Sequence, residues 1–95
     1  MNQILLVSSA ELQQEFADYL KKQRKRAKLS RTALAERSTV PAATLKKFEL
    51  TGQISLRQFL LLWQSLDDLC RLQQLTQSKP AKDTPPKTIE EVLAR

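Results

Sequence analysis

The chain has 95 residues and a formal net charge of +6, which suits one domain with a modest core. Leucine, alanine, glutamine, lysine and arginine are abundant and aromatic residues are few, so the composition favours an all-α fold. The sequence has no histidine, one cysteine and no glycine-rich phosphate loop. These absences exclude Ser-His-Asp and Cys-His catalysis and most zinc sites. We therefore expect that the protein is not an enzyme and that it binds no cofactor and no metal ion.

No stretch approaches the roughly 18 to 20 apolar residues that span a bilayer. The first seven residues lack the basic region and the length of a signal peptide. Cys70 is the single cysteine, which fits a reducing compartment, and its place between Leu69 and Leu72 favours a core position over a redox role. We expect a cytoplasmic protein without a membrane partner.

Helix-start signals divide the chain. Ser8 and Glu11 form a capping box that opens a helix over about 9–27. Ser30 is a good N-cap for a helix over about 31–38, and Pro41 opens another over about 42–50. A further helix follows over about 56–66, where Ser55 and Gln58 form a second capping box. The last is expected over about 69–77, with Asp67 or Asp68 as its N-cap.

The first 77 residues are predicted to form one domain, and residues 78–95 a proline- and lysine-rich linker with a short C-terminal helix. Charge is concentrated within that domain. Residues 1–20 carry a net −3, residues 21–47 carry +9 and residues 48–95 are neutral. A run of like charge is usually a solvated face, so the basic segment needs a second observation to gain a functional meaning.

Two short helices separated by a tight break supply that observation. The run LSRTALAER at 29–37, followed by VPAATLKKFE at 40–49, resembles the helix-turn-helix of the XRE/phage-repressor family. The resemblance covers residues 12 to about 75 and implies a five-helix, lambda-repressor-like domain that binds DNA. Leu34, Val40, Leu45 and Phe48 fall where the two helices would share a core.

The resemblance makes the second short helix the recognition helix, which enters the major groove. Its base-contacting candidates are Ala42, Ala43, Lys46 and Lys47. The candidates for phosphate contacts, which release counterions, are Lys21, Lys25, Lys28, Ser30, Arg31 and Thr44. In the family, the residues that match Arg24 and Glu49 form an ion pair, so a structural role is expected for both.

The sequence departs from the family at two positions. The turn usually holds glycine and here holds Thr39. A β-branched residue at positive φ is costly, so we expect the turn to be reshaped. In the family, the first short helix begins with a glutamine, and here that residue is Arg31. Arg31 can still contact a phosphate, but the replacement weakens any inference from the family about which bases are read.

Residues 59–63 are apolar on every side of a helix. One face covers the domain's own core, and the remainder is expected to form a homodimer interface. The dimer and core candidates are Phe59, Leu62, Trp63, Leu66 and Leu69. A two-fold dimer would present two recognition helices about 34 Å apart to a palindromic operator. The alternative is that the last helix folds back over its neighbour.

The segment 38–58 resembles the HipB-type branch of the family, whose members are encoded beside HipA-like Ser/Thr kinase toxins. The resemblance implies an antitoxin that represses its own operon and binds the kinase. Two alternatives remain open: a protein–protein adaptor that has lost DNA binding, and a phage-type repressor without a toxin. Ile89, Val92 and Leu93 share one face of the short final helix and are candidates for docking the kinase, or for docking back on the domain.

Overall fold

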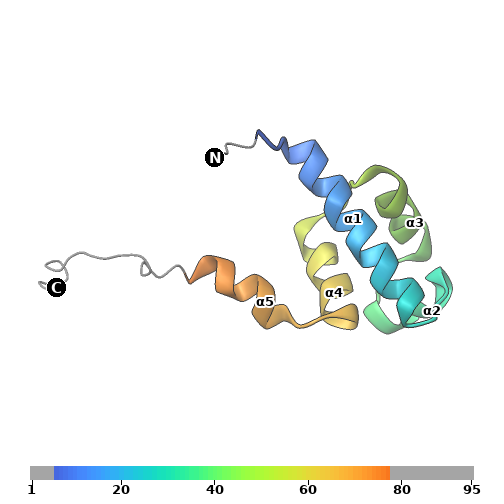
Figure 1. The fold of residues 1–95 in the computed structure, drawn as a ribbon. Coiled ribbons are helices and arrows are strands. Elements are labelled where there is room, and N and C mark those ends of the chain that lie inside the picture. Colours follow the sequence, from blue (N-terminus) through green and yellow to red (C-terminus); the bar gives the residue numbers. More distant parts are fainter. Residues whose placement is uncertain (1–5, 78–95) are drawn as a thin grey trace, which may run out of the picture.

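The structure is a computed structural model that describes residues 6–77. It contains the helices α1 (Ser9–Arg26), α2 (Arg31–Ser38), α3 (Ala42–Thr51), α4 (Leu56–Leu66) and α5 (Leu69–Gln73), and a 3-10 turn at Gln74–Thr76 (Figure 1). No strand occurs within these described residues, so the all-α expectation is confirmed for them. The linker at 78–95 and the docking candidates Ile89, Val92 and Leu93 lie outside the described residues.

Side-chain caps explain where the helices begin. The Ser8 hydroxyl accepts from the Glu11 amide at 3.0 Å, and the Glu11 carboxylate accepts from the Ser8 amide at 3.1 Å. Ser30 accepts from the amide of Ala33, and Ser55 from that of Gln58. Each cap satisfies an amide that the first helical turn leaves without a partner. These starts were predicted correctly from the sequence.

The last helix is shorter than expected. The sequence predicted one helix over 69–77, whereas α5 ends at Gln73 and the chain tightens into the 3-10 turn. Asp68, rather than Asp67, caps α5 by accepting from the amide of Cys70 at 2.9 Å. Residues 73–77 are exposed, so little packing is available to lengthen a helix that is too short to persist alone.

The core lies where α1 and α2 both pack against α3 and α4. Figure 1 shows α1 crossing the domain in front of α3 and α4, while α5 projects away from the other helices. The buried apolar residues include Leu34, Val40, Leu45 and Phe48, as predicted. Ala17 and Leu20 of α1 and Leu62 and Trp63 of α4 complete the core.

The turn between α2 and α3 keeps a left-handed residue without glycine. Thr39 has φ 68° and ψ 9°, and its amide donates to the Ala35 carbonyl at 2.8 Å. The Ser38 hydroxyl also accepts from the Val40 amide at 3.2 Å, and both of these residues are buried. The expectation that Thr39 reshapes the turn was therefore wrong. Buried neighbours on both sides hold the backbone, and Thr39 bears a strain of about 1–2 kcal/mol.

Candidate nucleic-acid interface

Glu49 joins three helices. Its side chain, on α3, is only 2% exposed. Arg24 of α1 donates from Nε to Oε2 at 2.7 Å and from Nη2 to Oε1 at 3.1 Å. Arg31 of α2 donates from Nε to Oε1 at 2.9 Å. We call Arg24, Arg31 and Glu49 the arginine clamp. The pairing of Arg24 with Glu49 is the one that the family resemblance implied.

The arginine clamp sets the charge state of Glu49. Burial raises the pKa of its carboxyl, but hydrogen bonds and attraction from Arg24 and Arg31 outweigh burial and hold the pKa below its ordinary value. Glu49 is therefore ionised at neutral pH. One negative charge faces two positive charges here, and the excess positive charge lies where α1, α2 and α3 meet.

Two glutamines of α1 add further contacts to the end of α3. The Gln13 amide donates to the Gly52 carbonyl at 3.2 Å, and the Gln14 amide donates to the Glu49 carbonyl at 3.4 Å. These carbonyls belong to the last turn of α3 and its C-cap, where the helix itself supplies no donors. This role of Gln13 and Gln14 could not be predicted from the sequence, because side chains 35 and 39 residues away from their partners leave no local pattern.

One side of α3 is buried against the core, and the opposite side is exposed to solvent. Leu45, Phe48 and Glu49 are buried, whereas the exposed residues at helical spacing are Ala43, Lys46, Lys47 and Leu50. Of the other predicted contacts on this helix, Ala42 and Thr44 are half-buried. The exposed face thus presents two long cationic side chains between two apolar ones.

The predicted phosphate contacts lie near the same junction. Lys25, Lys28 and Ser30 are exposed at the end of α1 and in the turn to α2, and Lys21 is half-buried. The arginine clamp fixes this end of α1 beside α3. Arg31 differs from the others, because its Nε already has a partner inside the protein and its side chain is 36% exposed. The sequence assigned it to the DNA backbone alone and missed the bond to Glu49.

The predicted dimer residues divide into two groups. Leu62 and Trp63 are buried within one chain, and Phe59 and Leu66 pack against the same core. The core part of their prediction is therefore confirmed, because the chain's own helices already cover these side chains. Leu69 remains 37% exposed. Cys70 is also exposed, so its predicted core position was wrong.

An apolar groove of about 420 Å³ runs between α4 and α5. It is lined by Leu60, Leu69, Cys70, Leu72, Gln73 and Thr76. Neither Leu60 nor Leu69 is covered by the domain core. The apolar surplus that the sequence placed in residues 59–63 thus lies at Leu60 and continues along α5.

A polar corner holds the start of α5 against α1. The Tyr19 hydroxyl donates to Asp67, and Arg71 donates to the Tyr19 hydroxyl at 2.9 Å and to Asp67 at 2.7 Å. The guanidinium of Arg71 also lies 5.8 Å from the centre of the Trp63 ring. The hydrogen bond from Tyr19, the Asp68 amide and Arg71 hold the pKa of Asp67 below its ordinary value. We call Tyr19, Asp67 and Arg71 the α5 corner.

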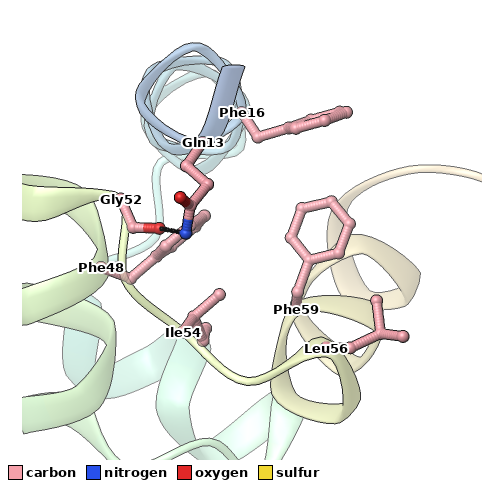
Figure 2. A pocket seen from close by; sticks show the side chains of 7 residues that line it. All are labelled: Gln13, Phe16, Phe48, Gly52, Ile54, Leu56 and Phe59. Atoms are coloured by element: carbon pink, nitrogen blue, oxygen red, sulfur yellow. Dashed lines mark hydrogen bonds between the residues drawn. The ribbon is translucent and has the colours of Figure 1, made fainter. Parts of the chain in front are cut away.

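A second pocket, of about 270 Å³, lies between α1, the α3–α4 loop and α4 (Figure 2). Figure 2 shows Gln13 reaching toward Gly52 on one side, with Phe59 and Leu56 on the other. The pocket is open and chiefly apolar, and none of its lining residues is titratable. It therefore offers no acid, base or nucleophile for catalysis.

Comparisons with protein-family models, with curated proteins and with solved structures found no match for this chain. Among residues 6–77, no helix combines the length and the apolar character that crossing a membrane requires. The same residues contain no cluster of three or more side chains able to hold a metal ion.

Proposed function

We propose that the chain is a sequence-specific, DNA-binding transcriptional repressor with a helix-turn-helix of the XRE type. The observation that carries the proposal is the exposed face of α3, where Lys46 and Lys47 stand beside Ala43 while the opposite face is anchored by Glu49. A helix held in this way can enter a major groove about 12 Å wide.

In this proposal, α3 reads bases and its surroundings hold the backbone. Lysine donates to the acceptors of guanine, and alanine methyls pack on thymine methyls, so Lys46, Lys47, Ala42 and Ala43 specify sequence. Lys21, Lys25, Lys28, Ser30 and Thr44 contact phosphates and position the domain without reading sequence. The high positive charge of residues 21–47 supports this division, because a protein–protein adaptor has no need to concentrate charge there.

We further propose that the repressor is a homodimer formed through the groove between α4 and α5. Its support is the exposed apolar surface around Leu60 and Leu69, which a second copy would cover. A two-fold dimer would match a palindromic operator. Sedimentation of the full chain as a monomer at micromolar concentration would defeat this proposal.

The resemblance to the HipB-type branch extends the proposal to an antitoxin that represses its own operon and binds a HipA-like kinase at the nucleoid. A pull-down of the neighbouring gene product with the full chain, and with a chain truncated after Gln77, tests this part. The truncated chain is expected to dimerise and bind DNA while losing the kinase, because the stripe of Ile89, Val92 and Leu93 is then absent.

DNA binding is tested by selecting duplexes from a random-sequence pool and measuring their dissociation constants by fluorescence anisotropy. Replacing Lys46 or Lys47 by alanine is expected to weaken operator binding by about 1–3 kcal/mol and to relax preference at one base pair per half-site. Arg57→Ala is the matched control, because it removes one positive charge from an exposed position on α4 instead. Equal losses for the operator and for random duplexes would make both lysines phosphate contacts, and failure to enrich any duplex would reject the function.

A further inference from the structure

We propose that Arg31 is a positioning residue for α3 and acts on DNA recognition through Glu49. The inference rests on the proposed function. Arg31 is the first residue of α2, and its Nε donates to Glu49 Oε1 at 2.9 Å. Its effect on DNA binding would therefore come from the orientation of the recognition helix.

The two oxygens of Glu49 are held from two different helices. Oε2 accepts from Arg24 on α1, and Oε1 accepts from Arg31 on α2 as well as from Arg24. Arg24 is further fixed, because its Nη1 donates to the Leu29 carbonyl at 2.9 Å. The carboxylate thus ties α3 to both neighbours, and loss of either arginine leaves one helix without a charged contact to α3.

Directional contacts matter here because, apart from the arginine clamp and the hydrogen bonds from Gln13 and Gln14 to its C-terminal end, α3 packs through apolar side chains. Leu45 and Phe48 bury α3 against the core without specifying its rotation, since apolar burial is non-directional. A binding surface needs its side chains held within about 0.5 Å and 10–20° of the productive geometry. Charge-assisted hydrogen bonds from planar guanidinium groups provide such constraints on the side of α3 opposite Lys47.

The arrangement also separates Arg31 from the other basic residues of the junction. Lys25 and Lys28 are exposed, whereas Arg31 donates to a carboxylate that is 2% exposed. Moving Arg31 to a phosphate would break its charge-assisted hydrogen bond to the buried Glu49 carboxylate and leave that carboxylate with Arg24 alone, which is unfavourable. The structure therefore favours an arginine that stays with Glu49 when DNA binds.

The test compares Arg31→Gln with Arg37→Gln, which removes an equal charge from an exposed position on the same helix. For each variant, affinities are measured for the selected operator and for a random duplex, over a range of salt concentrations and well below the melting temperature. Arg31→Gln is expected to lower the ratio of operator to random affinity about tenfold with an unchanged salt slope, whereas Arg37→Gln leaves the ratio unchanged. Arg31→Lys, which keeps the charge without the planar guanidinium, is expected not to restore the ratio.

Two other outcomes would overturn the inference. Equal loss on both duplexes, with a salt slope smaller by about 0.9, would make Arg31 a phosphate contact. A lower melting temperature with an unchanged ratio would make it a structural residue only. The same Arg31→Gln change in a Glu49→Gln background should have little further effect on the ratio of operator to random affinity, and an undiminished effect there would also overturn the inference. A wild-type chain that binds all duplexes equally rejects the proposed function itself, whereas the other outcomes reject only the role of Arg31.

Discussion

The arginine clamp and the α5 corner use the same chemistry, a carboxylate paired with arginine, in different surroundings. The Glu49 side chain is almost fully buried and accepts from two arginines on two other helices. Asp67 is held by Tyr19 and by Arg71, whose side chain is 58% exposed. Water therefore competes more strongly at the α5 corner, through Arg71, than at the buried carboxylate of Glu49, although Arg31 is 36% exposed.

This difference determines what each site contributes. A buried carboxylate that loses its partners is strongly unfavourable, so the arginine clamp fixes the relative placement of α1, α2 and α3. At the α5 corner the Asp67 side chain is 11% exposed but that of Arg71 is 58% exposed, and an ion pair with so exposed a partner contributes little to stability, so this corner holds α5 more loosely. The domain therefore combines a firmly oriented α3 with an α5 that is held more loosely.

The largest expected effect comes from Glu49→Ala. This change removes the carboxylate that both Arg24 and Arg31 contact, so the buried guanidinium of Arg24 loses its counter-charge. The free energy of unfolding should fall by about 3–5 kcal/mol. Urea denaturation followed by circular dichroism measures the loss. Asp67→Ala is the matched carboxylate control and should give a much smaller loss; comparable losses at the two sites would contradict the comparison.

Acid should reproduce part of this effect. The folded pKa of Glu49 lies below the ordinary value of 4.5, so Glu49 stabilises the fold above about pH 4.5. That contribution is lost as the pH falls through the folded pKa and the carboxylate takes a proton. The stability difference between the wild type and Glu49→Gln should therefore shrink on acidification from pH 7, and a difference that is constant from pH 7 to pH 3 would contradict the assignment.

Gly52→Ala should have the next largest effect, because the added methyl group would push the end of α3 away from α1 close to the arginine clamp. Gly52 has φ +80°, and an added Cβ would lie 3.1 Å from backbone atoms of Gln13 and Gln14. The backbone cost of about 1–2 kcal/mol therefore adds to a contact that no flexible side chain can relieve. We expect a loss of about 2–3 kcal/mol in thermal or urea unfolding, and a loss below 1 kcal/mol would show that α1 moves aside.

Thr39→Gly should change stability in the opposite direction. Glycine removes the strain of a β-branched residue at φ 68°, although it also increases the entropy of the unfolded chain. The expected net result is a gain of up to about 1 kcal/mol in the free energy of unfolding. Thr39→Ala is the control that keeps a Cβ, and a destabilising Thr39→Gly would show that the threonine side chain makes a favourable contribution.

Local signals predicted much of this fold from the sequence. Serine caps and helical periodicity located the starts of α1, α2 and α4, because a cap acts within three residues of its partner. The core at Leu34, Val40, Leu45 and Phe48 followed from the spacing of apolar residues. The family resemblance, rather than spacing, supplied the pairing of Arg24 with Glu49.

Other features depended on contacts between distant residues. The bond from Arg31 to Glu49 joins residues 18 positions apart, and that from Tyr19 to Asp67 joins residues 48 apart. No periodic pattern encodes such pairs. The exposure of Cys70 was likewise misjudged, because an apolar run does not reveal which of its faces the remaining helices cover.

Tyr19→Phe is expected to have the smallest effect and to separate the two sites most clearly. The phenyl ring can keep the stacking on Trp63, where the centroids are 5.3 Å apart, while the loss of the hydroxyl removes the contacts to Asp67, Arg71 and Gln23. Global stability should fall by about 1 kcal/mol or less, since the lost hydrogen bonds are partly replaced by water. Amide hydrogen exchange should become faster in α5 and stay unchanged in α3, because local opening follows local contacts. Faster exchange in both helices would show that the α5 corner and the arginine clamp form one cooperative unit, and the proposed division between a fixed α3 and an adjustable α5 would then be wrong.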